Sequence, residues 1–136
     1  MKIFLILILV STIYADDSKL ESVIFDKIIN VVVQKIDPKI YIHEKIESID
    51  TYKSNFNIVA NCEEADMVIL STIKDIPSTC KGKILFGTRY SHLKNEEVIG
   101  AFFWMKGRPN ILFYQERLNQ KNIKLDSSFD KYVEDE

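Results

Sequence analysis

Asp66-Met67-Val68-Ile69-Leu70-Ser71, with its later counterpart Lys83-Ile84-Leu85-Phe86-Gly87, is the stretch that decides the fold. Each of the two runs holds consecutive apolar residues with no polar position between them. A strand with one face in water alternates apolar and polar residues, whereas a continuous apolar run is typical of a parallel strand covered on both faces. The sequence therefore predicts an α/β fold, a three-layer sandwich built on a mostly parallel sheet.

The residues before this stretch predict one long helix and two further strands. Ser18 and Glu21 have the spacing of a capping box, which predicts that the helix begins at Ser18. Residues 39–43 and 55–60 are predicted strands, with a short helix over 44–52 between them. The apolar stripe that we expect to face the core is Leu20, Val23, Ile24, Ile28, Val31 and Val32.

The last third of the chain predicts an antiparallel hairpin. Two apolar segments, 98–105 and 111–114, flank Lys106-Gly107-Arg108-Pro109, which we expect to form the turn. A short helix over 117–122 and a terminal helix from Ser127 through Tyr132 should follow the hairpin.

The first fifteen residues predict export. They combine a short positive start, an unbroken apolar run over 3–10 and a polar-to-small exit over 11–15, which is the pattern of a signal peptide. The alternative is a membrane anchor, but the apolar stretch over 3–14 is shorter than the roughly 20 residues that cross a bilayer. We therefore expect cleavage after Ala15, a single α/β domain over 16–136, and a periplasmic or secreted location.

Composition excludes two classes of protein. Removal of residues 1–15 takes away one Lys and no acidic residue, so the formal charge changes from −2 to −3. Basic and acidic residues alternate along the rest of the chain, and no basic stripe of the kind that binds nucleic acid is present. With four Gly and three Pro, the chain also lacks the composition of a disordered protein.

The chain has two cysteines, Cys62 and Cys80, and both lie in the part that we expect to be exported. Each stands four residues before a predicted strand, so neighbouring parallel strands would bring the two together. In an oxidising compartment we expect a structural disulfide that closes a loop of about 19 residues. A redox-active pair, free thiols and an intermolecular bridge stay open as alternatives, although no C-x-x-C motif is present.

Arg89, Tyr90 and His92 follow the fourth predicted strand as a cluster of side-chain donors. Ligands of open α/β sheets collect outside the carboxyl ends of the strands, so these residues are candidates for a small-molecule site. The alternative is a polar surface loop. We expect no metal, because His43 and His92 lack further ligands, and no cofactor. No nucleophile-elbow motif is present, and we assign no catalytic residue.

Phe102, Phe103 and Trp104 are predicted to fill the core. An exposed share of these aromatic residues would instead indicate a surface for a partner, because aromatic and Arg side chains are the usual anchors of interfaces. Trp104 is therefore also a partner candidate. Arg108, at the end of the hairpin, is the candidate contact at the rim of such a surface.

One series of segments in the last third follows a known order. The residues are Ile99-Gly100-Ala101-Phe102-Phe103, Lys106-Gly107-Arg108, Ile111, Phe113, Arg117-Leu118 and Ile123-Lys124-Leu125-Asp126-Ser127-Ser128-Phe129. This order resembles the C-terminal signature of the YfiR family of small periplasmic regulators, in which an apolar strand, a charged-Gly-Arg turn, a second strand, a short helix, a Leu-x-Ser segment and a closing helix follow one another. Pro109 and the Trp104-Met105 pair depart from the pattern.

The resemblance implies a non-enzymatic periplasmic protein, often a homodimer, that restrains a membrane-bound diguanylate cyclase by binding its periplasmic sensor region. It carries over no ligand residue. Two other hypotheses stay open on the residues alone. One is a small-molecule binding domain that uses Arg89, Tyr90 and His92, and the other is a thiol enzyme with an accessible cysteine.

Overall fold

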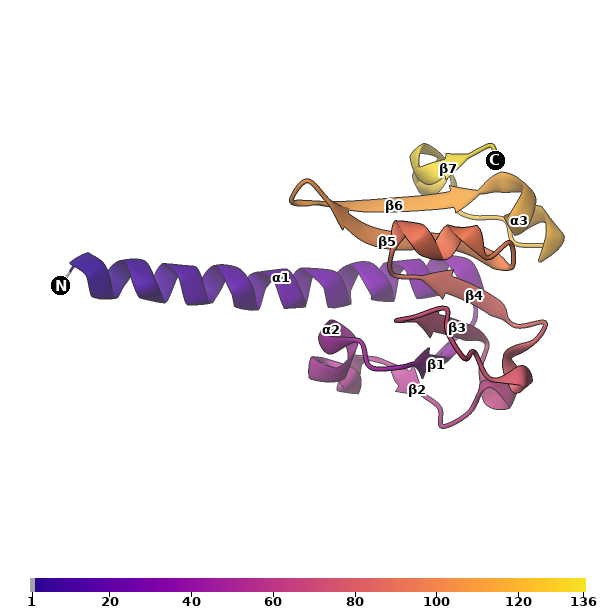
Figure 1. Ribbon diagram of the computed structural model, residues 1–136, viewed down its shortest axis with the longest axis horizontal. Coiled ribbons are helices and arrows are strands. Elements are labelled where there is room, and N and C mark those ends of the chain that lie inside the picture. The colour runs from indigo at the N-terminus through magenta and orange to yellow at the C-terminus, as the bar shows by residue number, and fades with distance from the viewer. Residues whose placement is uncertain (1) are drawn as a thin grey trace.

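The computed structural model describes residues 2–136, with side chains described from residue 17 onward. These residues form one seven-stranded sheet in the order β2-β1-β3-β4-β5-β6-β7 (Figure 1). The strands are β1 Lys39–His43, β2 Asn57–Ile58, β3 Met67–Leu70, β4 Ile84–Gly87, β5 Val98–Met105, β6 Arg108–Tyr114 and β7 Val133–Glu134. β5 and β6 are antiparallel, and the other neighbouring strands are parallel. The predicted α/β fold is confirmed.

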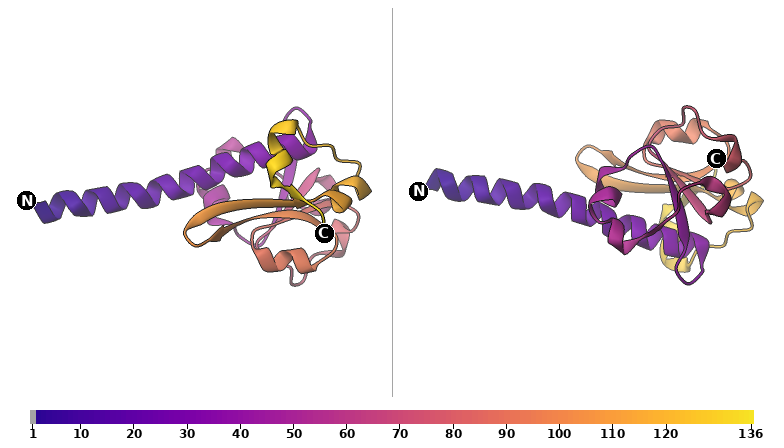
Figure 2. Two further views of the ribbon diagram at one scale, coloured as in Figure 1. Left: turned by 90° about the horizontal axis from the view of Figure 1, so that it is seen from above. Right: turned by 90° about the horizontal axis from the view of Figure 1, so that it is seen from below.

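Helical segments cover both faces of this sheet. The α-helices are α1 Lys2–Val33, α2 Glu47–Thr51 and α3 Gln115–Gln120, and the short 3-10 helices are η1 Lys53–Asn55, η2 Cys62–Glu64, η3 Ser78–Cys80, η4 Tyr90–Lys94 and η5 Ser127–Tyr132. α1 lies on one face of the sheet and η4 on the other (Figure 2). The two faces carry separate apolar clusters, one packed against α1 and one under η2, η3 and η4. The arrangement is a three-layer sandwich.

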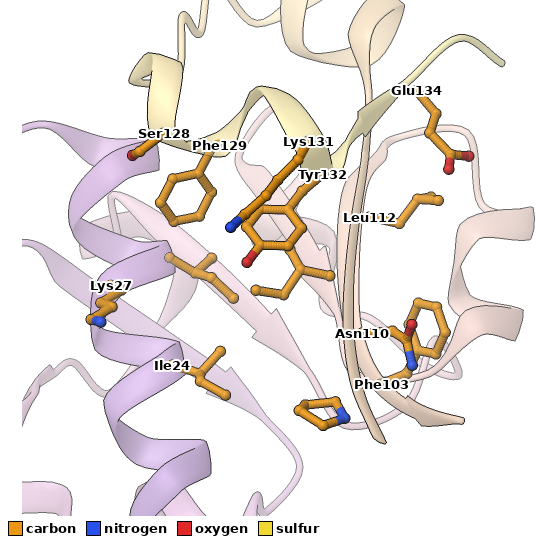
Figure 3. Close-up of a pocket in the computed structure, with 13 residues that line it drawn as sticks. Ile24, Lys27, Phe103, Asn110, Leu112, Ser128, Phe129, Lys131, Tyr132 and Glu134 are labelled. Carbon is orange, nitrogen blue, oxygen red and sulfur yellow. The ribbon is translucent and has the colours of Figure 1, made fainter. Parts of the chain in front are cut away.

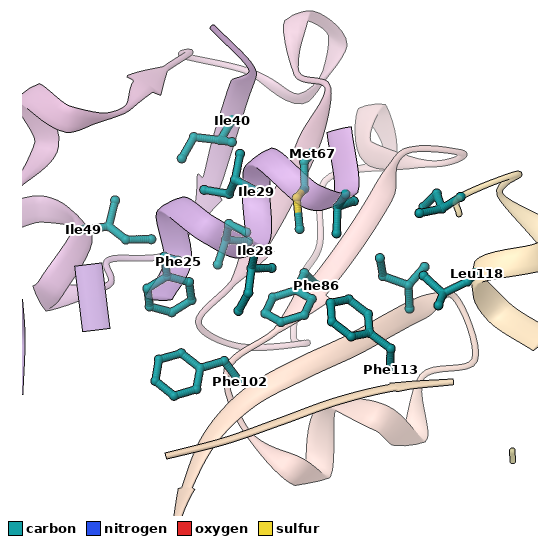
Figure 4. Packing of buried hydrophobic residues seen from close by; sticks show 14 residues of the cluster. Phe25, Ile28, Ile29, Ile40, Ile49, Met67, Phe86, Phe102, Phe113 and Leu118 are labelled. Atoms are coloured by element: carbon teal, nitrogen blue, oxygen red, sulfur yellow. The ribbon is translucent and has the colours of Figure 1, made fainter. Parts of the chain in front are cut away.

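α1 packs on the sheet through a stripe that overlaps the predicted one, since Ile28 and Val32 are buried and Ile24 and Val31 pack against the same apolar cluster. Phe25, Ile28, Ile29 and Val32 are buried with i, i+3, i+4, i+7 spacing, and they meet Phe86, Phe102 and Phe113 of the sheet (Figure 4). Leu20 and Val23 are 44% and 43% exposed, so their predicted core positions are wrong. Apolar residues surround much of this helix, and the periodicity alone therefore did not single out the face that meets the sheet.

The beginning of α1 differs from the sequence prediction as well. The helix spans Lys2–Val33, so Ser18 lies inside it and not at its N-cap. The signal peptide was predicted for residues 1–15, which lie outside the residues whose side chains are described. In the part of the chain that is described, none of the helices has both the length and the apolar content that crossing a bilayer requires.

The second apolar cluster contains a disulfide. Cys62 of η2 and Cys80 of η3 are bonded, with their Cα atoms 4.9 Å apart, and both are buried. β3 and β4 are in parallel register from Met67 opposite Ile84, so the two crossovers that precede these strands arrive side by side. The predicted pairing is confirmed, and the bridge links the crossovers that cover this face of the sheet.

The hairpin turn is tighter than predicted. Lys106 and Gly107 alone form it, with φ values of 53° and 74°, which is the backbone of a two-residue type I′ turn. Pro109 lies in β6 opposite Trp104, so its predicted place in the turn is wrong. Proline is tolerated there because the position is on an edge strand and its missing amide would point away from β5.

The C-terminal segment also differs from the predicted helix. Residues 127–132 form the 3-10 helix η5, whose N-cap is Asp126, since the Asp126 side chain accepts a hydrogen bond from the Ser128 amide. β7 follows and pairs in parallel with the end of β6, Phe113 opposite Val133. A strand of two residues has no periodicity, and the sequence therefore did not reveal β7.

Candidate interaction surface

His92, one of the predicted ligand residues, is buried in η4. Its Nδ1 accepts a hydrogen bond from the Thr88 backbone amide at 3.0 Å. A Cβ atom at Gly87 would lie 2.6 Å from the His92 Cβ, so the close approach of η4 to β4 requires glycine there. Burial, with a smaller contribution from the Arg89 charge, lowers the pKa of His92 below its usual value. The His92 imidazole therefore supports the loop after β4.

Arg89 and Tyr90 lie on the surface beside it. Tyr90 is 55% exposed and contacts Phe103 edge to face, with ring centroids 5.4 Å apart. Five cavities in the described part of the chain are lined by other residues than Arg89, Tyr90 and His92. The three residues are neighbours along η4, but the structure does not gather them around a cavity.

His43 lies at the carboxyl end of β1, on the edge of the sheet from which the loop after β4 also leaves. Its side chain is buried, and Nε2 donates a hydrogen bond to the Lys74 carbonyl oxygen at 2.7 Å. Within the described residues, no group of three or more His, Cys, Asp and Glu side chains is placed to hold a metal ion. Both histidines thus make hydrogen bonds with backbone groups.

The end of the β5–β6 hairpin presents aromatic and apolar side chains to solvent. Phe102 and Phe103 are buried, in the apolar clusters on opposite faces of the sheet. Trp104 is 40% exposed, and its predicted core position is wrong. Its Nε1 donates a hydrogen bond to Glu21 Oε2 of α1 at 2.8 Å. Met105, the next residue, is 47% exposed.

The turn of α1 that holds Glu21 also carries the exposed residues Leu20 and Val23. The hairpin runs beside α1 toward the same end of the molecule in each view (Figures 1 and 2). We call Leu20, Val23, Trp104 and Met105 the hairpin patch. Arg108, predicted as a rim contact, is exposed and faces Met105 across the turn. The structure therefore places Trp104 and Arg108 at the same end of the hairpin, and it places Arg89, Tyr90 and His92 at η4.

A groove continues from the hairpin patch along α1. It has a volume of about 750 Å³ and lies between α1, β6 and η5 (Figure 3). Its apolar lining includes Ile24 of α1, Pro109 and Ile111 of β6, and Phe129 and Tyr132 of η5. Two lysines also line it, Lys27 from α1 and Lys131 from η5. The lining of the groove thus combines apolar side chains with polar and charged ones, a combination that is typical of binding sites.

Arg117 of α3 is buried and holds the C-terminal wall of this groove in place. Its Nη1 donates hydrogen bonds to the carbonyl oxygens of Leu93, Asn95 and Val98, at 2.9, 3.1 and 2.9 Å. Nε and Nη2 donate to the two carboxylate oxygens of Glu136 at 3.0 and 2.9 Å. These bonds lower the pKa of Glu136. The segment with η5 and β7 is thereby tied to the crossover between β4 and β5.

Comparison with known proteins bears on the fold. No family model and no curated protein matches the chain. The crystal structure of a conserved domain protein from Vibrio cholerae O1 biovar El Tor matches 82% of this chain with a TM-score of 0.57 and 9% sequence identity. The match spans 58% of that protein's length. At this identity the likeness shows a shared α/β fold.

Sequence reasoning missed several residues of the surface. The sequence does not distinguish Glu21, Lys27 and Lys131 from other exposed charged residues. Their positions at this surface follow from the packing of α1 beside β6 and η5. Arg117 gave no signal either, because its partners are three backbone carbonyls and Glu136, 19 residues away. The aromatic run 102–104, which ends next to the predicted turn, was the feature of the sequence that indicated this surface.

Proposed function

We propose that the chain is a non-enzymatic regulatory protein that acts by binding another protein outside the cytoplasm. The observation that carries the proposal is the exposure of Trp104 at the hairpin end, where its Nε1 donates to Glu21 in the turn of α1 that also carries the exposed Leu20 and Val23. Tryptophan is the residue most enriched among the energetic anchors of protein interfaces. A contiguous apolar surface at one end of a small domain is typical of an interaction site.

The cysteines and the predicted signal peptide support a location outside the cytoplasm. A buried disulfide is compatible with an oxidising compartment, where such bonds persist. The predicted signal peptide over residues 1–15 would deliver the chain there. We therefore place the working domain in the periplasm, where its partner would be the exposed region of a membrane protein.

The resemblance to the YfiR family suggests the kind of partner. The order β5, charged turn, β6, α3 and η5 follows the segment order of that family's C-terminal signature. In this proposal the chain restrains a membrane-bound signalling protein, such as a diguanylate cyclase, by binding its periplasmic sensor region. A homodimer is compatible with this role.

The test is co-purification of the exported domain with the periplasmic region of a membrane-bound sensor or cyclase encoded beside its gene. We expect the wild-type domain to retain the sensor region and Trp104→Ala to lose it. Tyr90→Ala is the matched control, because it removes an exposed aromatic residue that packs on Phe103, on the other face of the sheet. Retention of the sensor region by Trp104→Ala, or equal loss with Tyr90→Ala, would contradict the proposal.

A further inference from the structure

The edge of β6 beside the groove has no neighbouring strand along most of its length. β5 pairs with one side of β6. On the other side β7 pairs with Phe113 and Tyr114 only, so within the described residues no strand lies on that side of residues 108–112. Five residues of strand offer an edge of about 17 Å. The chain before β7 leaves the sheet as η5, and the space between this edge and α1 is the groove (Figure 3).

The backbone of this edge can form hydrogen bonds with an added strand. Counted from the two-residue turn, Met105 and Arg108 form a hydrogen-bonded pair, and hydrogen-bonded pairs then alternate with non-hydrogen-bonded ones. Ile111, opposite Phe102, falls in a non-hydrogen-bonded pair, so its N–H and C=O point away from β5. Phe113 has the same parity, and it is the residue that pairs with β7. Ile111 thus presents a donor and an acceptor to the groove, whereas Pro109, which has the same parity, presents only its carbonyl oxygen.

The charges around the groove are mostly positive, although the chain as a whole carries −2. Lys27 and Lys131 line the groove, and Lys106 and Arg108 stand at its hairpin end. None of these four cations is in an ion pair with a carboxylate of the described residues. Glu134 is the acidic residue in the lining, and Glu21 is engaged by Trp104. The excess of cations favours an acidic occupant.

We propose that the groove binds an extended segment of a partner protein whose side chains on the face toward α1 and η5 are apolar and acidic in turn. The segment adds to β6 by hydrogen bonds with Ile111, sets apolar side chains against Ile24 and Phe129, and points carboxylates at Lys27 and Lys131. Strand addition supplies affinity through the backbone, and the alternate side chains supply specificity. This inference deepens the proposed function and rests on it for the existence of a protein partner.

The test uses two synthetic peptides of eight residues with the exported chain, both with Thr at every second position: in the Glu peptide Val and Glu alternate at the other positions, and in the Lys peptide Lys replaces Glu. By amide NMR we expect the Glu peptide to shift Ile111 and the residues beside it, and the Lys peptide to bind about tenfold more weakly or worse. Lys27→Glu/Lys131→Glu should weaken binding of the Glu peptide by about tenfold. Lys53→Glu/Lys81→Glu, the same charge change at exposed lysines outside the groove, should not.

Equal binding of the two peptides, no binding at millimolar concentration, or insensitivity to the Lys27→Glu/Lys131→Glu change would overturn the inference. So would a dimer that this double variant dissociates in sedimentation velocity, because a second copy would then occupy the groove. Preferential binding of anionic phospholipid vesicles through the hairpin would also overturn it. The peptide result does not depend on the co-purification, so failure of the proposed partner and failure of the groove remain distinguishable.

Discussion

Arg117 joins segments that are far apart in the chain, and its loss should be costly. In Arg117→Ala three carbonyl oxygens lose their donor, and we expect the free energy of unfolding to fall by about 3 kcal/mol. Lysine cannot reproduce the planar fork, so Arg117→Lys should recover little of this. Urea denaturation of the two variants measures the loss.

Glu136→Gln is the control for Arg117. The Glu136 side chain is partly exposed and regains water when the ion pair is lost, so this change should cost much less than Arg117→Ala. Equal losses in the two variants would show that the three carbonyl bonds contribute nothing measurable.

His92 makes stability depend on pH. Its pKa is lowered in the folded state, so the unfolded chain binds the proton more readily. The stabilisation is complete above the unfolded pKa, about 6.5, and is lost as the pH falls from there through the folded pKa. We expect the urea midpoint to decrease over this range, and less so in His92→Asn, whose side-chain oxygen can still accept from Thr88. An unchanged pH dependence in His92→Asn would assign the effect to other groups.

Ser48 of α2 carries a buried hydroxyl with no hydrogen-bond partner among the described residues. Ser48→Ala removes this unpaired group, and we expect unfolding free energy to stay the same or rise by up to about 1 kcal/mol. Ser22→Ala is the matched change, because the buried Ser22 hydroxyl donates to the Lys19 carbonyl oxygen at 2.7 Å and its removal should not stabilise. Thermal unfolding of the two variants checks the difference in sign.

At the scale of elements, the disulfide holds η2 to η3 over the second apolar cluster. On the chain-entropy model, Cys62→Ser/Cys80→Ser should lower the free energy of unfolding by about 3 kcal/mol. The measurement is urea denaturation with and without a reductant. Reductant should destabilise the wild type and leave the double variant unchanged. A double variant as stable as the oxidised wild type would show that the loop is already restrained in the unfolded chain.

The strands were predictable where burial produces a continuous or an alternating pattern of apolar residues in the sequence. β1, β3, β4 and β5 lie where the sequence predicts them, because their side chains are sorted by the faces of the sheet. The core face of α1 was predicted in part: Ile28 and Val32 are buried as expected, but Leu20 and Val23 are exposed, because apolar residues lie on several sides of that helix and the sheet selects among them. The helical segment over Ser127–Tyr132 was predicted, although it is a 3-10 helix capped by Asp126, and β7 was missed because its two residues are paired only by β6.

At the scale of the molecule, the candidate surface is assembled from three distant segments. Residues 20–28, 104–112 and 128–134 meet only after the sheet has formed. The sequence predicted Trp104 and Arg108 as partner residues from their types, but it could not place Lys27 or Lys131 beside them. Arg89, Tyr90 and His92 are close in sequence, but they do not share one role. His92 supports the loop after β4 through its hydrogen bond with the Thr88 amide.

Trp104 has one further consequence for the whole molecule. It is the single tryptophan of the chain, so the tryptophan emission of the protein comes from the point where the hairpin meets α1. A partly hydrated indole beside a carboxylate emits toward the red, and its emission moves to the blue when a partner covers it. The protein thus contains its own optical reporter, and a titration followed by emission wavelength reads out occupancy of the hairpin end without a label.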